Sequence, residues 1–119
     1  MFDIIITTYN RPIRVLNLVH QLRICEGLDG GSIIIVDSSE EVNNDLVSMG
    51  GVKYLRSSHK NQPYQRYLGY KASSSEVLLF LDDDMQVIDK FFLSKLKVIF
   101  EDTTINGVAI KFNNKHDNP

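Results

Sequence analysis

Residues 77–85 read VLLFLDDDM, a run of five apolar residues that leads directly into three adjacent carboxylates, Asp82, Asp83 and Asp84. Such an unbroken apolar run predicts a strand that is covered on both faces, as in a parallel sheet. Ligands of these sheets bind beyond the carboxyl ends of the strands. Two interpretations of the carboxylates are open: a solvated acidic turn, and a site for a divalent cation such as Mg²⁺ or Mn²⁺, which prefers carboxylate oxygens.

The length and composition indicate one globular domain. The chain has 119 residues, of which 43% are hydrophobic and 24% are charged, and its net charge is −2. A single domain spanning residues 1–119 is large enough for one hydrophobic core. The sequence shows no basic cluster and no stripe of basic and aromatic residues, so we do not expect the protein to bind nucleic acid.

The single cysteine and the two ends of the chain limit its setting. Cys25 cannot form an internal disulfide, and it falls in phase with Leu18 and Leu22 on a helical pattern, which predicts a core position. The apolar start is interrupted by Asp3 and is too short to span a bilayer, so we expect no membrane span and a cytoplasmic location. The polar end of the sequence, residues 111–119, indicates either a natural tail or a longer protein that has been cut.

Strands and helices are predicted to alternate along the chain. The predicted strands are residues 2–7, 32–36, 52–56, 77–81 and 107–112, and the predicted helices are 12–25, 38–49, 63–72 and a last helix after residue 89. Ser38 with Glu41 has the form of a capping box, and Asp89 is expected to cap the last helix. The alternation predicts an α/β domain, a three-layer, doubly wound and mainly parallel sheet.

In this sheet, the ends of the first, second and fourth strands share one edge. The polar residues that follow them, 8–11, 37–39 and 82–84, are therefore expected to converge. Residues two apart in an extended segment point the same way, so Asp82 and Asp84 are expected to face one site and Asp83 another. Such a set suits a nucleoside diphosphate, because Asp37 can accept hydrogen bonds from a base or ribose and arginines can meet phosphate oxygens. Taken singly, each residue also has a plainer interpretation, as a helix cap or a solvated side chain.

Four blocks of the sequence resemble the family 2 glycosyltransferases, which have the GT-A fold. The blocks are IIITTYNRP at residues 4–12, IIIVDSS at 33–39, NQPYQRYLGYKAS at 61–73 and FLDDDM at 80–85. They occur in the order and spacing that the family uses, over nearly the whole chain. The resemblance implies a Rossmann-like GT-A domain, a nucleotide-diphosphate sugar as donor, with UDP-sugars favoured, and a glycan or other hydroxyl compound as acceptor.

The same resemblance implies roles for individual residues. In the family, the residues at the positions of Thr8 and Tyr9 border the nucleoside, the residue at Asp37 binds the base, and the residue at Arg66 contacts the nucleotide. The expected nucleotide-sugar-binding residues are Thr8, Tyr9, Arg11, Asp37, Arg66, Asp82 and Asp83, and the expected ligands of Mn²⁺ or Mg²⁺ are Asp84 and Asp82. Two positions depart from the family pattern, since Pro63 and Tyr67 stand where Gly and Asn are frequent.

The family also implies inversion at the anomeric carbon, with attack by an acceptor hydroxyl as the nucleoside diphosphate leaves. The metal would stabilise charge on the leaving phosphate. A general base must take the acceptor proton, and the family supplies it from its C-terminal half. No carboxylate of this chain sits in a matching motif, so we assign no base. The chain resembles the donor-binding half of such an enzyme.

Other functions compete with this one. A non-catalytic nucleotide-sugar-binding or regulatory module would also lack the acceptor half, and the length of the source gene beyond Pro119 would distinguish the two. A receiver domain has a similar length, but residues 7–10 lack the acidic residues that it requires. The sequence has no dinucleotide-binding or P-loop motif, and its histidines lack metal-ligand spacing. Apolar surface left exposed would favour a homodimer.

Overall fold

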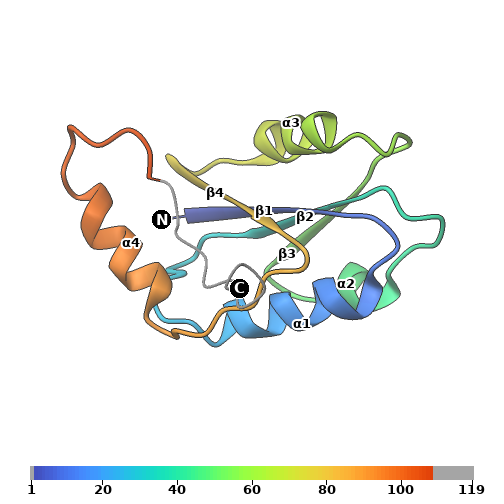
Figure 1. Cartoon of the computed structure of the whole chain (residues 1–119), viewed down its shortest axis with the longest axis horizontal. Helices are drawn as coiled ribbons and strands as arrows, with labels where there is room; N and C mark the ends of the chain where they lie inside the picture. Colours follow the sequence, from blue (N-terminus) through green and yellow to red (C-terminus); the bar gives the residue numbers. More distant parts are fainter. Residues whose placement is uncertain (1, 109–119) are drawn as a thin grey trace, which may run out of the picture.

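The computed structural model describes residues 2–108 as a four-stranded parallel sheet with helices on both faces (Figure 1). The strands lie in the order β3-β2-β1-β4, so β1 is central. The strands are β1 (Phe2–Thr8), β2 (Ile33–Asp37), β3 (Val52–Arg56) and β4 (Val77–Asp82), and the helices are α1 (Pro12–Arg23), α2 (Asn44–Val47), α3 (Gln62–Ala72) and α4 (Phe92–Phe100). The predicted α/β class and the parallel sheet are confirmed.

The alternation of side chains along β1 builds a core on each face of the sheet. Ile4 and Ile6 pack with α1, α2 and α4, in a cluster that also contains Cys25, as the helical pattern predicts. Ile5 points to the opposite face, which α3 covers (Figure 1). The helix approaches β1 closely there, because a Cβ atom at Gly69 would lie 2.4 Å from Cγ2 of Ile5. The inner face of α3 therefore has little room for change.

The predicted coverage of β4 on both faces is met only in part: Leu79 and Leu81 pack in the cluster with α1, and Leu78 packs on the α3 side, but most of the strand is not fully buried. β4 pairs with β1 on one side and lies at the edge of the sheet within residues 2–108. Only Leu81 is buried, and Phe80 is 44% exposed. Apolar side chains there line a hollow of about 470 Å³ together with Leu96 and Phe100. The apolar run therefore predicted more burial of β4 than residues 2–108 provide.

Two predicted helix caps were wrong. The helix α2 begins at Asn44 rather than Ser38, whose hydroxyl instead donates to Gln65 Oε1 at 3.3 Å. The helix α4 begins at Phe92, because Asp89 accepts a hydrogen bond from the N–H of Phe91 and so closes the turn before the helix. A tertiary hydrogen bond thus takes the hydroxyl of Ser38, whereas a local turn competes with the helix for the side chain of Asp89.

The last predicted strand, residues 107–112, lies mostly outside the described residues, and the described part, 107–108, is not a strand. Within residues 2–108, no helix has the length and apolar character that crossing a membrane requires.

A buried carboxylate holds the amino end of β1. Asp3 is 2% exposed, and its Oδ1 accepts a hydrogen bond from the N–H of Ser32 at 2.9 Å. Its Oδ2 accepts from the hydroxyl of Ser73 at 2.7 Å and from the N–H groups of Ser74 and Ser75 at 3.0 and 3.3 Å. Burial alone would raise the pKa of Asp3, but these hydrogen bonds outweigh burial and lower the pKa to about 2. Asp3 thereby joins the start of β1 to the segments that precede β2 and β4.

Candidate functional site

A cleft of about 400 Å³ opens at the carboxyl edge of the sheet. Three segments that are distant in the sequence form its walls: the end of β1, the start of α3 and the end of β4. The lining residues are Thr7, Thr8, Tyr9, Arg11, Lys60, Gln62, Gln65, Asp82, Asp83 and Asp84. Of the three groups predicted to converge, those after the first and fourth strands line this cleft, whereas residues 37–39 after the second strand do not. Ligands of parallel α/β sheets bind at this edge.

The middle carboxylate of the three connects the ends of β1 and β4. Asp83 is 7% exposed, and its Oδ2 accepts a hydrogen bond from the hydroxyl of Thr8 at 2.8 Å. Its Oδ1 accepts from Nη1 of Arg11 at 2.9 Å. Both oxygens of Asp83 are therefore used within the protein, and Asp83 fixes Arg11 on the wall of the cleft.

The carboxylates on either side of Asp83 are more open. The side chain of Asp82 is 56% exposed, and its Oδ1 accepts from Nε2 of Gln62 at 3.0 Å and lies 3.6 Å from Nη2 of Arg66. Asp84 is exposed and forms no ion pair with any residue in the range 2–108. Strand geometry ends at Asp82, so Asp83 and Asp84 lie in the following turn. As a result, all three carboxylates line one cleft, and the expectation that Asp83 faces a separate site was wrong.

These open carboxylates suit a divalent cation that is shared with a ligand. Oδ2 of Asp82 and the carboxylate of Asp84 are the oxygens that remain free for it. No cluster of three or more His, Cys, Asp or Glu side chains able to hold a metal ion occurs in the described part of the chain. A cation held here would therefore take its other oxygens from the ligand and from water, which is the usual arrangement for Mg²⁺ bound with phosphates.

The start of α3 and the loop before it supply side chains that sequence reasoning missed. In the loop before α3, Nζ of Lys60 lies 4.1 Å from the centroid of the Tyr9 ring and adds a positive charge to the cleft. Gln65 is buried, and its Nε2 donates to the carbonyl oxygens of Thr8 and Val36 at 3.2 and 2.9 Å. The sequence did carry a signal for Gln65: it is a polar residue four positions before Gly69, and therefore on the same, buried face of α3. The sequence carried no signal for Lys60.

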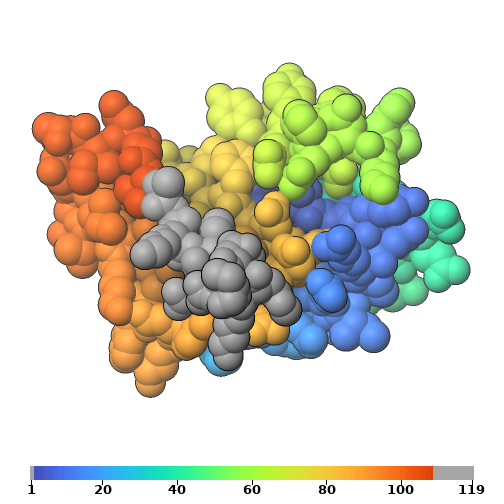
Figure 2. All heavy atoms as spheres, in the orientation of Figure 1, coloured from blue at the N-terminus to red at the C-terminus, as the bar shows by residue number. Residues whose placement is uncertain are grey.

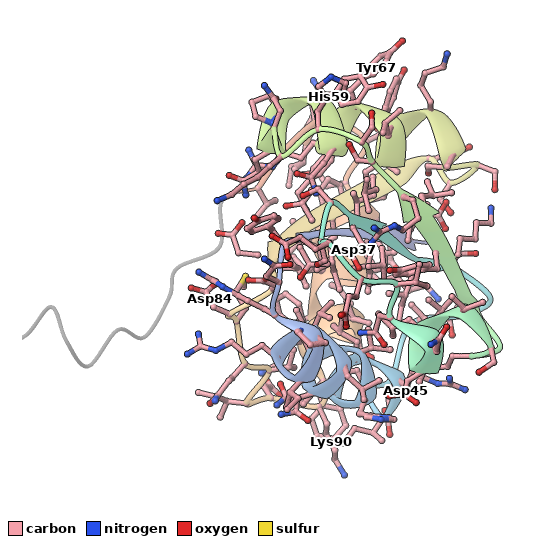
Figure 3. All side chains as sticks on the ribbon, turned by 90° about the vertical axis from the view of Figure 1, so that its right-hand side faces the viewer. Asp37, Asp45, His59, Tyr67, Asp84 and Lys90 are labelled. Carbon is pink, nitrogen blue, oxygen red and sulfur yellow. The ribbon has the colours of Figure 1, made fainter. Side chains whose placement is uncertain are left out.

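The carboxylate at the end of β2 does not enter the cleft. Asp37 is 2% exposed, and its Oδ1 accepts hydrogen bonds from the N–H and the hydroxyl of Ser39. Its Oδ2 accepts from the hydroxyl of Tyr54 at 2.5 Å and lies 3.4 Å from Nη1 of Arg56. Figure 3 shows Asp37 and Asp84 apart at this end of the molecule. Because protein donors occupy both oxygens of Asp37, its carboxylate holds the loop after β2 in this geometry.

This loop in turn is tied to the turn after β1. The N–H of Asn10 donates to the hydroxyl of Ser39 at 2.6 Å. Asn10 has a φ of +50°, in the left-handed region that asparagine tolerates better than most residues. The turn that carries Tyr9 and Arg11 into the cleft is thus supported from β2, through Ser39 and Asp37.

A sequence model described as glycosyl transferase family 2 matches residues 3–119, which is almost the entire chain. The chain belongs to this family. Among curated protein sequences, none matches the chain.

Solved structures of a Staphylococcus aureus protein, TarS, share the fold of this family member. The structure of TarS residues 1–349 has a TM-score of 0.74 and 19% identity, covering 93% of this chain and 38% of that one. Its complex with UDP gives a TM-score of 0.72, also at 19% identity with 93% and 38% coverage. Its complex with UDP-GlcNAc gives a TM-score of 0.69 at 19% identity, with 93% and 37% coverage. The expected GT-A fold is confirmed, and the chain spans less than two fifths of these neighbours.

Proposed function

We propose that this chain binds a nucleoside diphosphate sugar and is the donor-binding part of a glycosyltransferase. The observation that carries the proposal is the cleft at the carboxyl edge, where Asp82 and Asp84 keep free oxygens beside Arg11 and Lys60. Membership of the family supports the reaction class. The TarS neighbours crystallised with UDP and UDP-GlcNAc support a uridine nucleotide as the donor.

The residues of the cleft divide by chemistry. Asp84 and Oδ2 of Asp82 would hold Mn²⁺ or Mg²⁺, which when bound neutralises charge on a diphosphate. Arg11, fixed by Asp83, offers its remaining N–H groups to phosphate or base oxygens. Thr8 and Tyr9 would border the nucleoside. Asp37 acts indirectly in this proposal, because its oxygens already hold the loop after β2.

Lys60, in the loop before α3, adds a second positively charged side chain to the proposed diphosphate site. Lys60 lies over the Tyr9 ring, so its ammonium group is within reach of a ligand that rests against Tyr9. Arg66 lies beside Asp82, where it would contact the nucleotide from its helix. In the proposed reaction, the acceptor oxygen bonds to the anomeric carbon with inversion, the bond from that carbon to the diphosphate oxygen breaks, and the acceptor proton passes to a base.

Titration calorimetry tests the donor site directly. We expect heat of binding with at least one of UDP, GDP and dTDP, and tighter binding when Mn²⁺ or Mg²⁺ is present, because the free carboxylate oxygens need a cation to meet a diphosphate. The variant Asp45→Ala, an exposed carboxylate on α2 away from the cleft, is the matched control and should bind as the original chain does (Figure 3). Absence of heat with all three nucleotides, with and without metal, would overturn the proposal.

A further inference from the structure

The outer face of α3 is unusually aromatic. Tyr64, Tyr67 and Tyr70 are 43%, 51% and 59% exposed, whereas Gln65 and Gly69 on the inner face are buried. Figure 3 shows Tyr67 projecting from the helix away from the sheet, and Figure 2 shows α3, in lime green, as an outer ridge of the molecule. Exposed aromatic rings gathered on one face of a helix mark an interaction surface.

Two basic side chains lie near this face of the helix. Residues 46–75 contain five lysines and arginines and no aspartate or glutamate, although the chain as a whole has a net charge of −2. Nζ of Lys53 donates to the carbonyl oxygen of Ala72 at 3.4 Å, so Lys53 lies at the C-terminal end of α3. Nζ of Lys71 lies 5.7 Å from the centroid of the Tyr67 ring. Two lysines therefore lie beside the exposed tyrosines of α3.

The two lysines are free to meet an external anion. Lys53 and Lys71 are exposed and form no ion pair within residues 2–108, whereas Arg56 and Arg66 pair with Asp37 and Asp82. We call Tyr67, Tyr70, Lys53 and Lys71, with Tyr64 at the rim, the α3 outer surface. None of these residues lines either cleft described above. A convex surface of this kind suits an extended anionic surface better than a small anion, which needs a cavity.

We propose that the α3 outer surface binds a membrane surface that contains anionic lipids. Tyrosine rings are enriched at the level of the lipid headgroups, because one end is apolar and the other polar. Lysine stems pack along apolar surface while their ammonium groups meet the anionic headgroups. Because only two lysines are available, the tyrosine rings must supply part of the affinity through apolar contact at the headgroup level. The proposal does not rest on the donor site.

Sedimentation with lipid vesicles tests this surface. We expect the chain to sediment with phosphatidylcholine vesicles that contain phosphatidylglycerol and not with pure phosphatidylcholine, and added salt should weaken the binding. Lys53→Gln with Lys71→Gln should weaken it by about tenfold. Arg14→Gln with Arg23→Gln, exposed on α1, removes the same charge elsewhere and should change it by less than about twofold.

The tyrosines provide an independent variant. Tyr67→Ser with Tyr70→Ser should also weaken vesicle binding by roughly tenfold. The residual binding of this double variant should still weaken when salt is added, because both lysines are present. Circular dichroism should show that all three double variants keep the fold. Equal sedimentation with neutral and anionic vesicles, equal loss in the α1 control, or no sedimentation at all would overturn the proposal. Self-association or binding of single-stranded DNA through Tyr67 and Tyr70, without vesicle binding, would assign the surface to another partner.

Discussion

The two ends of the β1–β4 pair hold carboxylates in opposite situations. At the amino end, Asp3 is 2% exposed and accepts four hydrogen bonds from serine donors. At the carboxyl end, Asp84 is exposed and forms no ion pair with any described residue, and Asp82 keeps one oxygen free. A carboxylate whose oxygens meet protein donors stabilises the fold, whereas one with free oxygens is available to a ligand. Position at the ligand-binding edge alone does not decide the role.

Asp83 and Asp37 show why position is insufficient. Asp37 ends β2 and Asp83 follows β4 at the ligand-binding edge, yet both are nearly buried and use their two oxygens within the protein. They resemble Asp3 in their hydrogen bonding and Asp84 in their location. The comparison therefore predicts that Asp83 and Asp37 mainly maintain the geometry of the cleft. Asp84, in contrast, is predicted to act on the ligand itself.

Removing Asp3 should have the largest effect on this comparison. Asp3→Ala leaves the N–H groups of Ser32, Ser74 and Ser75 without their acceptor, and we expect the free energy of unfolding to fall by about 3 kcal/mol. Chemical denaturation measures this change, and Asp84→Ala is the matched control, expected to change stability by less than about 0.5 kcal/mol. A loss below about 1 kcal/mol for Asp3→Ala would mean that water replaces the carboxylate with little cost.

Lowering the pH should have an intermediate effect, because it removes the stability that Asp3 contributes at the amino end. The pKa of Asp3 is lowered from 3.8 to about 2, so the unfolded chain binds a proton at this residue before the folded chain does. The stability that Asp3 contributes is complete above about pH 4 and is lost as the pH falls toward 2, a change of about 2 kcal/mol. Chemical denaturation at a series of pH values across this range should show that the free energy of unfolding falls more steeply with decreasing pH for the original chain than for Asp3→Asn. Parallel curves would contradict the assignment.

The smallest expected effect is at the open end and concerns binding alone. Asp84→Ala should remove the strengthening of nucleotide binding by Mn²⁺ or Mg²⁺, a loss of about tenfold or 1.4 kcal/mol, because a free metal ligand is lost. Calorimetry with and without metal measures it, and Asp45→Ala should retain the metal effect. If metal strengthens binding equally in Asp84→Ala, Asp84 is not a ligand of the cation.

Much of this arrangement could be predicted from the sequence. Apolar runs that alternate with helical patterns require a parallel sheet, and its connections bring the ends of β1 and β4 together. The exposure of β4 could not be predicted, because residues far from Phe80 in sequence determine what covers it. The cap at Ser38 failed because Gln65, on another helix, takes its hydroxyl.

The role of Asp37 had a signal that the sequence reading did not use. Tyr54 and Arg56 are two residues apart on β3 and therefore point to the same face, beside the end of β2. Their hydroxyl and guanidinium groups are the donors that a buried carboxylate needs. Lys60 had no comparable signal, since its contact with Tyr9 depends on the conformation of the loop before α3.

The two faces of α3 differ in how freely their residues can be replaced. Gln65 holds the carbonyl groups of two strands, and Gly69 leaves no space beside Ile5, so substitutions on the inner face disturb the cleft. The outer face, with Tyr67 and Tyr70, contacts solvent and carries no such restriction. Over evolutionary time, descendants of this protein can therefore change the outer face of the helix while they retain the same cleft.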